Sequence, residues 1–297
     1  MASRNKPAVR RRRSKQSKRS NRITRFFKAL AVSAIASFSA ASCVLHPQLR
    51  EQVSIEPLLA QVGIFGERGL APITPVSGSY AQTRFAECRG LFPDEQPPAV
   101  PAGPALRELC FDAFAILHSG RTRTPVFVVQ RLNRRLLQQA QHIERTDRFY
   151  EEARLPAAER AELNDYRRSG YSRGHMAPAA DMHTPEAMAQ SFSLANMVPQ
   201  DQRHNSGPWA KIESDTRKYI LRARGDVYVF TGPVYADRFQ TIGDGKVAVP
   251  TYLYKLVYDA TTRRSWVHWQ ANHAGATAGP PIRYEEFVRR TGLRLLP

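Results

Sequence analysis

The chain of 297 residues is 42% hydrophobic and 24% charged, an ordinary composition for a globular protein. Its three cysteines include no Cys-x-x-Cys pair, which argues against a cysteine-based zinc site. The net charge of +18 falls mostly at the start, because residues 1–30 hold 12 Lys and Arg and no acid, and the rest of the chain holds 32 basic against 26 acidic residues. The charge of the folded part is therefore weak support for nucleic-acid binding.

Residues 1–45 have the features of a basic targeting segment. The basic stretch runs to Lys28, and the apolar run 29–45 that follows is long for a secretory signal and short for a membrane span. Small residues at 39–42 offer a cleavage site. We expect an exported protein, periplasmic or secreted, or one that contacts the membrane through an anchor at 29–45. A basic arm that binds nucleic acid is the third alternative.

Residues 46–105 are rich in Pro, Gly and small residues, with four prolines in 97–104, and we predict a poorly ordered linker there. Cys88 and Cys110 lie 22 residues apart. In an exported protein they can pair and close a loop. Two buried free thiols fit the sequence equally well.

Residues 106–297 are predicted to form the folded domain. The expected strands are 111–117, 125–130, 227–231, 252–258 and 265–269, with 194–199 as a short strand or an extended loop. The expected helices are 131–145, 184–191, 205–221 and 284–291, and 156–168 suits a loop or a short helix. Because strands and helices do not alternate as βαβ units, we predict an α+β fold with a mainly antiparallel central sheet flanked by helices.

His175 is the first candidate for chemistry. It stands in Tyr171-Ser-Arg-Gly-His-Met-Ala-Pro178, a segment with no amphipathic period, so core packing does not explain it. Arg173, a cation suited to phosphate, lies two residues before it. An amide-rich stretch follows within 30 residues, made up of Asn196, Gln200, Gln202 and Asn205.

Glu213 and Arg217 follow Asn205 by eight and twelve residues. On one helix, all three side chains can point towards one site. Phosphodiester hydrolysis needs these groups together with a histidine. A neutral imidazole takes a proton from the attacking water. An amide oxygen helps to hold a hydrated Mg²⁺, a carboxylate orients its waters, and an arginine neutralises charge on the phosphate.

Three motifs occur in order: Ser172-Arg-Gly-His-Met-Ala-Pro178, Leu194-Ala-Asn-Met-Val-Pro-Gln200 and Asn205-x-x-x-Trp209-x-x-x-Glu213-x-x-x-Arg217. Together they resemble the DNA/RNA non-specific endonuclease family, which has a ββα-metal (His-Me finger) site and includes secreted bacterial nucleases and mitochondrial endonuclease G. The similarity runs from near Phe111 to about Trp269.

The resemblance implies a sugar-non-specific nuclease that hydrolyses DNA and RNA with Mg²⁺, which Mn²⁺ can replace. His175 would be the general base and Asn205 the sole protein ligand of the metal. Glu213 would hold metal-bound water, Arg217 would contact the scissile phosphate, and Arg173 would support the site and bind substrate. Both nucleic acids would be bound through their phosphates without sequence preference, and a homodimer is compatible with the resemblance.

The chain departs from the commonest family motif at Ser172, where that motif begins with Asp. Serine stands there in a branch that resembles mitochondrial exo/endonuclease relatives, so endonuclease and exonuclease modes both stay open. Asp165 and Asp181 are nearby acids. We expect each to be a solvated or capping residue.

Gly170-Tyr-Ser-Arg-Gly174 also fits G-x-S-x-G, the nucleophile elbow of serine esterases, with Ser172 as nucleophile. That elbow requires a buried strand before the serine, and the polar residues 160–169 do not suit one. A zinc site made of His175, His183 and His204 lacks helical i, i+4 spacing. We expect the last two histidines at the surface.

A catalytically impaired nucleic-acid-binding protein on the same scaffold is the alternative from another class. The presence of both His175 and Asn205 favours activity over this alternative. We expect His175 at the end of a strand or in the adjoining loop, and Asn205 at the start of the opposing helix. Their side chains should face each other across a gap that fits a hydrated cation and a phosphodiester. The resemblance to the family implies cleavage that leaves a 5′-phosphate.

Overall fold

The computed structural model describes residues 78–297. The predicted targeting segment, residues 1–45, and residues 46–77 of the predicted linker lie outside the described residues. No helix within 78–297 is long and apolar enough to cross a bilayer.

The linker prediction is wrong for residues 78–105. This segment forms β1 (Tyr80–Gln82), η2 (Arg89–Leu91), η3 (Pro93–Glu95) and β2 (Ala99–Pro101), and β1 pairs antiparallel with β2. The rings of Phe85 and Phe92 are fully buried, with centroids 4.7 Å apart, and both pack on Phe127 of the central sheet. The burial of these two rings outweighs the breaking tendency of the nearby prolines.

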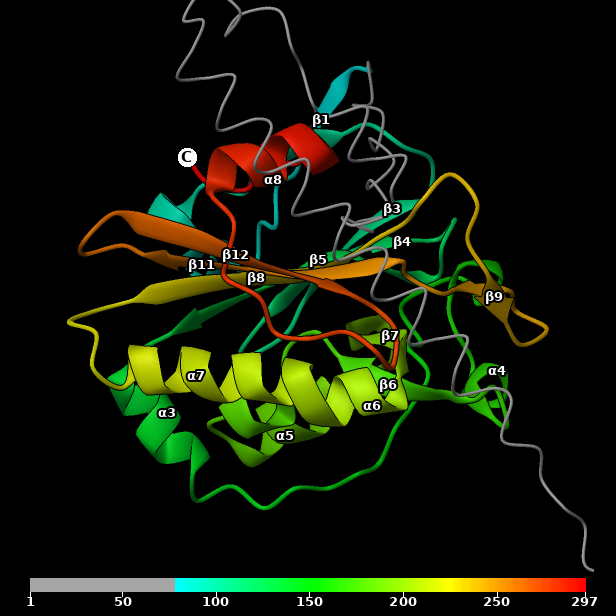
Figure 1. The fold of residues 1–297 in the computed structure, drawn as a ribbon, viewed down its shortest axis with the longest axis horizontal. Coiled ribbons are helices and arrows are strands. Elements are labelled where there is room, and N and C mark those ends of the chain that lie inside the picture. The colour runs from blue at the N-terminus through cyan, green and yellow to red at the C-terminus, as the bar shows by residue number, and fades with distance from the viewer. Residues whose placement is uncertain (1–77) are drawn as a thin grey trace, which may run out of the picture. The chain divides into compact units, whose positions relative to one another are not determined.

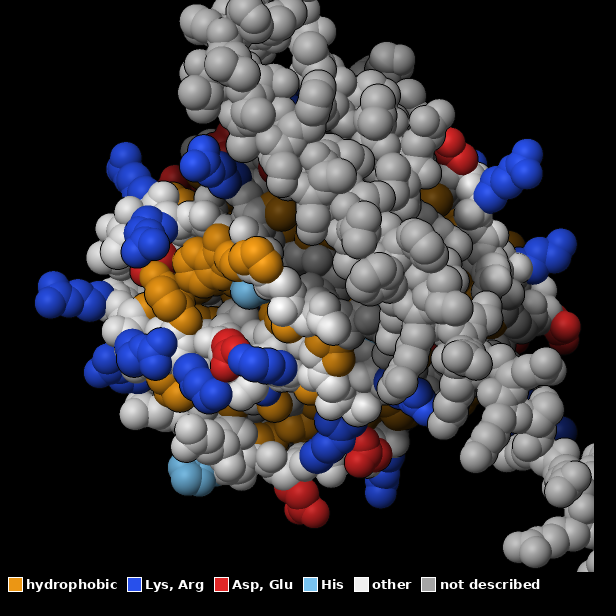
Figure 2. Space-filling view, in the orientation of Figure 1, with side chains coloured by type: hydrophobic (Ala, Val, Ile, Leu, Met, Phe, Trp, Pro, Cys, Tyr) orange, Lys and Arg blue, Asp and Glu red, His pale blue; other side chains and the backbone are white. Residues whose placement is uncertain are grey.

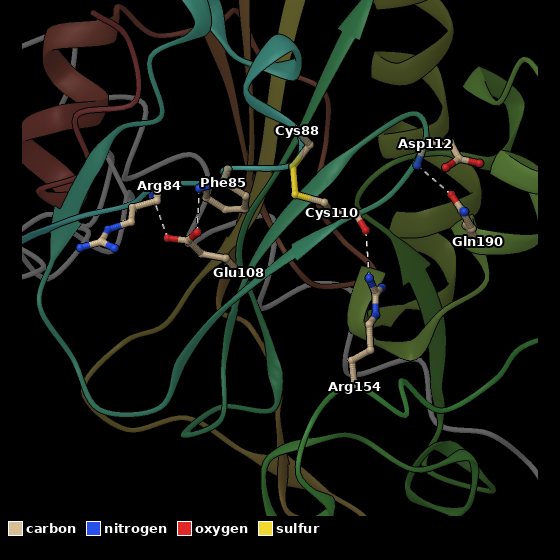
Figure 3. The surroundings of a disulfide bond; sticks show 8 residues. All are labelled: Arg84, Phe85, Cys88, Glu108, Cys110, Asp112, Arg154 and Gln190. Carbon is tan, nitrogen blue, oxygen red and sulfur yellow. Dashed lines mark hydrogen bonds between the residues drawn. A yellow bond between two sulfur atoms is a disulfide. The ribbon is translucent and has the colours of Figure 1, made fainter.

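A disulfide between Cys88 and Cys110 ties this segment to the sheet, with 5.7 Å between the two Cα atoms (Figure 3). Next to it, the carboxylate of Glu108 accepts hydrogen bonds from the backbone N–H groups of Arg84 and Phe85, at 2.8 and 2.7 Å. Of the two alternatives that the sequence leaves open, the structure has the paired cysteines.

The central sheet has six strands in the order β12-β11-β8-β5-β4-β3, and every neighbouring pair is antiparallel. The strands are β3 (Leu106–Cys110), β4 (Ala115–Ser119), β5 (Thr124–Leu132), β8 (Val227–Val234), β11 (Tyr252–Asp259) and β12 (Arg264–Ala271). The strand predicted at 111–117 is displaced, because Phe111–Phe114 form the turn between β3 and β4, closed by the Phe111 N–H donating to the Phe114 carbonyl.

Helices cover both faces of this sheet (Figure 1). On one face lie α3 (Arg134–Ala140), α5 (Pro185–Ser191), α6 (Gln202–His204) and α7 (Ala210–Ile220), and on the other lies α8 (Tyr284–Thr291). Val128 and Leu253 pack with Trp209 and Ile212 in the core beneath α7. Phe230 packs with Phe287 of α8 in the core on the opposite face. The predicted α+β fold with an antiparallel sheet is confirmed.

The remaining elements are short. They are η4 (Ala157–Glu159), α4 (Leu163–Tyr166), β6 (Tyr171–His175), η5 (Ala179–Asp181), η6 (Leu194–Asn196), β7 (Met197–Asp201), the π-helical turn η7 (Asn205–Trp209), β9 (Thr241–Ile242) and β10 (Val247–Ala248). As predicted, Thr184 caps α5, because its hydroxyl accepts a hydrogen bond from the Ala187 N–H at 3.1 Å.

Candidate active site

The site is built on the two-stranded hairpin β6–β7. The strands pair antiparallel, with His175 opposite Met197 and Tyr171 opposite Asp201. His175 is the last residue of β6, which confirms the expected place at a strand end. Since side chains alternate along a strand, Arg173 and His175 point to the same face of the hairpin.

Gly174 lies between these two residues because no side chain fits there. A Cβ at position 174 would come within 2.6 Å of the Gln200 Cβ on β7. The amide nitrogen of Gln200 donates a hydrogen bond to Nδ1 of His204, 3.0 Å away, and both side chains are fully buried. Gln200 therefore packs the hairpin against α6. The predicted surface position of His204 is wrong, because its ring also packs on Trp209, with ring centroids 5.7 Å apart.

Asn205 lies on the helical arm that follows β7. Asp201 caps the arm by accepting hydrogen bonds from the N–H groups of Arg203 and His204, so the arm begins at Gln202, three residues before the predicted start. Residues Asn205–Trp209 form a π-helical turn that contains Pro208, which has no N–H to donate. Asn205 is half-buried, and its carboxamide makes no hydrogen bond within residues 78–297.

The His175 imidazole stands between two phenylalanine rings. Its centroid lies 5.0 Å from that of Phe192 and 5.9 Å from that of Phe149. Nε2 is buried without a hydrogen-bond partner among the described residues. Burial and the positive charge of Arg145 lower the pKa of His175 to about 3, so the ring is neutral at physiological pH. A neutral imidazole with a free nitrogen is the form that accepts a proton.

Two arginines flank this imidazole. The Arg145 guanidinium lies over the Phe192 ring, 5.1 Å from its centroid, and the Arg173 guanidinium lies over Phe149 at 4.7 Å. Arg145 is exposed and was not singled out from the sequence, because it stands in a polar loop outside the motifs. Because both guanidinium groups pack on the phenylalanine rings next to His175, two positive charges lie near this imidazole, as a phosphate-binding site requires.

Asn196 fixes the chain as it leaves His175. Its Oδ1 accepts a hydrogen bond from the Ala177 N–H, and its Nδ2 donates to the carbonyls of Ala177 and Ser191, each at 2.9 Å. The Asn196 carbonyl also accepts the Met176 N–H. Asn196 is completely buried. Of the amides proposed from the sequence, Asn196 and Gln200 thus serve the scaffold.

Glu213 and Arg217 lie one turn apart on α7. The Arg217 guanidinium donates to the carboxylate of Asp181 on η5 at 3.1 Å. Glu213 forms no ion pair within residues 78–297, and burial raises the pKa of its carboxyl to about 7. The expectation that Asp181 is solvated or capping is wrong, since it is 5% exposed and pairs with Arg217. Asp165 does cap α4, by accepting the Glu162 N–H.

The sheet supplies a lysine beneath this helix. Lys255 on β11 is 1% exposed, and its ammonium group donates to the Thr231 hydroxyl at 2.8 Å. The sequence offered one signal for it, a single charge inside the apolar run 252–258. The side chain of Gln130 and the indole N–H of Trp209 are buried without hydrogen-bond partners among the described residues.

The predicted residues therefore fall into two groups. His175 and Arg173 share one face of β6, and Glu213 and Arg217 lie on α7 with Asp181. Within residues 78–297 no direct hydrogen bond or ion pair joins the two groups or joins either of them to Asn205. The arrangement of His175 facing Asn205 across a cation site stays a prediction.

A family model described as DNA/RNA non-specific endonuclease matches residues 98–290. The chain belongs to this endonuclease family. The match covers more than half of the chain and includes both groups of residues just described. It also begins before Phe111 and ends after Trp269, so it is longer than the motifs alone indicate.

Several curated relatives belong to the same family. Mitochondrial nuclease EXOG of Danio rerio is 38% identical over 147 residues, which is 46% of this chain and 42% of the relative. The EXOG of Homo sapiens is 33% identical over 183 residues, covering 58% and 48%. Human mitochondrial endonuclease G is 33% identical over 157 residues, covering 49% and 52%. The chain spans about half the length of these relatives.

The endonuclease fold is also found among solved structures. A crystal structure of the EndoG/EndoGI complex aligns with a TM-score of 0.60 and 25% identity, covering 73% of this chain and 92% of that chain. The family expected from the three motifs is confirmed.

The expected export or membrane anchoring is wrong. The relatives EXOG, nuclease 1 and endonuclease G are named as mitochondrial nucleases, and this finding contradicts the predicted periplasmic or secreted location and the anchor at 29–45. A basic and then apolar N-terminal composition does not by itself identify a destination.

The structure also bears on the two other chemistries considered from the sequence, a serine esterase and a histidine zinc site. Ser172 does not sit in a nucleophile elbow, because residues 163–166 before it are the helix α4 and the serine lies inside β6. No group of three or more His, Cys, Asp or Glu side chains converges as metal ligands in the part of the chain that is described. His175, His183 and His204 therefore form no zinc site.

Members of this family are metal-dependent nucleases, and the donor atoms of this chain fit a hard cation. The free carboxamide of Asn205 is half-buried and accessible. Glu213 offers carboxylate oxygens on the same helical arm. Oxygen donors that leave most of the cation's waters in place suit Mg²⁺.

Proposed function

We propose that this chain is a Mg²⁺-dependent nuclease that hydrolyses phosphodiester bonds in both DNA and RNA. His175 is the general base and Asn205 is the one protein ligand of the metal. The unpartnered Nε2 of His175 carries the proposal. It is a buried ring nitrogen, neutral at physiological pH, with two arginines beside it.

His175 takes a proton from the attacking water at Nε2. Phe149 and Phe192 hold the ring from two sides, so the nitrogen is oriented before substrate binds. Because its pKa is about 3, the free imidazole is neutral at physiological pH but only weakly basic, so the proton transfer needs an interaction that favours the protonated ring. The phosphate of the substrate, as it approaches, favours the protonated ring by its negative charge.

Arg217 contacts the scissile phosphate, and Asp181 holds it for that contact. Glu213 would accept hydrogen bonds from water held by the cation. When bound, Mg²⁺ neutralises charge that develops on the phosphate. Arg173 and the exposed Arg145 bind neighbouring phosphates, and the Lys and Arg side chains gathered over the region of α7, which include Lys211 and Lys218, extend that positive surface (Figure 2).

Binding through phosphates is indifferent to sequence and weakens as salt is raised. Mn²⁺ should replace Mg²⁺, because an uncharged amide discriminates little between the two ions. A homodimer remains part of the proposal, and sedimentation of the full chain tests it.

The proposal is tested with the purified full chain on supercoiled plasmid, linear duplex DNA and single-stranded RNA, with Mg²⁺ and with EDTA. We expect cleavage of all three in Mg²⁺, none in EDTA and products that carry 5′-phosphate. Nicking of the circular plasmid identifies an endonuclease, while loss of the linear DNA alone identifies an exonuclease. If the chain binds these nucleic acids but cleaves none of them with Mg²⁺ or with Mn²⁺, the proposal is contradicted. That result would favour a catalytically impaired nucleic-acid-binding protein.

A further inference from the structure

A charge-balanced cluster, buried at Asp181 and Lys255 and partly exposed at Glu213 and Arg217, lies between α7 and the sheet. It contains two carboxylates and two cations from three elements: Asp181 of η5, Glu213 and Arg217 of α7, and Lys255 of β11. Asp181 and Lys255 are 5% and 1% exposed. A buried charge is costly unless another charge compensates it, so the partners within the cluster decide which groups stay ionised.

The cluster contains one direct ion pair, between Arg217 and Asp181. Arg217 is within 3.1 Å of Asp181, and no other ion pair forms among these four residues. Lys255 is the other cation of the cluster, so its positive charge is the one that can compensate the charge of Glu213. Lys255 lies beneath the helix, with its ammonium group 5.4 Å from the centroid of the Trp209 ring, one turn before Glu213.

The strand register explains why a lysine stands here. Lys255 is paired with Thr231 on β8 and with His268 on β12, so the three side chains share the sheet face that α7 covers. The Thr231 hydroxyl accepts one hydrogen bond from the ammonium group. This anchors the charge at the sheet and leaves its other two N–H groups directed elsewhere.

We propose, on the basis of the nuclease function above, that Lys255 is a positioning residue whose buried ammonium group favours the charged form of the Glu213 carboxylate and holds it in place beneath α7. Lys255 touches no substrate. It acts through Glu213, which in the proposed function would accept hydrogen bonds from water held by the cation.

The charges around Glu213 agree with this role. Burial raises the pKa of Glu213 to about 7, the charge of Lys255 acts against that rise more than that of Arg217 does, and Asp181 adds to it. Burial in turn lowers the pKa of Lys255, while Glu213 and Asp181 raise it and Arg217 lowers it. His268 on β12 faces the same ammonium group, and Lys255 helps to lower the pKa of that imidazole.

A stability measurement without metal tests the pairing. In Lys255→Met the Glu213 carboxylate loses its compensating charge, so we expect the melting temperature at pH 8 to fall. Adding Glu213→Gln should then raise it again, so that the double variant melts above Lys255→Met. The matched control adds Asp215→Asn, an exposed acid on the same helix that pairs with Lys211, and this addition should not restore stability. If Asp181→Asn restores it and Glu213→Gln does not, Lys255 serves Asp181 and the proposal is overturned.

Steady-state cleavage at pH 7 gives the second readout. We expect Lys255→Met to lower kcat at least tenfold with little change in KM, and Lys255→Arg to recover part of that loss. Arg289→Met, an exposed cation on α8 at the opposite face of the sheet, should match the parent chain. A Lys255→Met variant with unchanged kcat would overturn the proposal. If the parent chain itself fails to cleave, the nuclease function is refuted, while the melting comparison still tests the Lys255–Glu213 pair.

Discussion

Arg217 and Asp181 form an ion pair with 3.1 Å between Nη1 and Oδ1, and this contact joins helix α7 to the segment that follows His175. The guanidinium side chain is 26% exposed and the carboxylate side chain 7%, so the outer side of Arg217 stays open to a ligand while its inner side is held. Charge-assisted contacts of this kind orient a side chain as well as stabilise it.

We therefore expect Asp181→Asn to lower kcat/KM about 10- to 100-fold, the usual effect of removing a partner that orients a site residue. Stability at neutral pH should be unchanged or higher, because burial raises the pKa of Asp181 and the amide removes the cost of the buried charge. Cleavage kinetics and thermal melting of the same preparation check both parts. Asp215→Asn serves as the control, and equal activity in the two variants would mean that Asp181 does not orient Arg217.

Asn205 should act on metal affinity alone. Its side chain is half-buried and makes no hydrogen bond in residues 78–297, so Asn205→Ala should change stability by no more than about 0.5 kcal/mol. Calorimetric titration with Mg²⁺ should show weaker binding in Asn205→Ala and tighter binding in Asn205→Asp, because a carboxylate adds charge to the ligand set. Identical Mg²⁺ affinities in all three proteins would remove Asn205 from the metal site.

The environment of His175 predicts how stability depends on pH. The folded protein holds the pKa of His175 at about 3, whereas an unfolded chain protonates this residue near 6.5. A depressed pKa contributes stability above pH 6.5, and that contribution is lost as the pH falls from 6.5 towards 3, by up to ~1.4 kcal/mol per pH unit.

His175→Asn removes this loss. Urea unfolding at pH 7.5 and pH 4.5 should show that the stability of the variant, relative to the parent, improves at the lower pH. His142→Asn, an exposed histidine, should show no such improvement. Parallel pH dependence in the parent and His175→Asn would mean that the imidazole is solvated.

The disulfide should contribute about 3 kcal/mol by restricting the unfolded chain. Cys88→Ser with Cys110→Ser is expected to lose that amount of unfolding free energy, and the reduced parent protein should unfold like the double variant. An unchanged urea midpoint in the double variant would show that the packing of Phe85 and Phe92 alone holds the N-terminal segment.

Local signals in the sequence predicted several elements well. Thr184 and Pro185 mark the start of α5, and Gly292 in the left-handed conformation (φ 70°) ends α8, so both helices lie where expected. Alternating apolar residues located β8, β11 and β12. By contrast, the continuous apolar run 111–117 concealed the turn before β4, because a buried turn has the same composition as a buried strand.

The sequence predicted those site residues that lie close together on one strand or one helix. It did not predict the contacts between residues that are far apart in the chain. His175 and Arg173 share a strand, and Glu213 and Arg217 share a helix, so spacing alone grouped each pair. Asp181 and Lys255 join the second pair only through packing between η5, α7 and β11, which no local pattern contains. The prolines in 97–104 suggested a linker. That prediction failed because the segment is held by the burial of Phe85 and Phe92 against β5, which is likewise a tertiary effect.

His175→Ala tests the central claim most directly. Cleavage of supercoiled plasmid is measured for this variant and for the parent chain at saturating Mg²⁺, together with the melting temperature of each. We predict a loss of at least about 100-fold in rate, the contribution typical of a general base, in a protein that remains folded. A folded His175→Ala variant that cleaves at nearly the parent rate would contradict the assignment of His175 as the base.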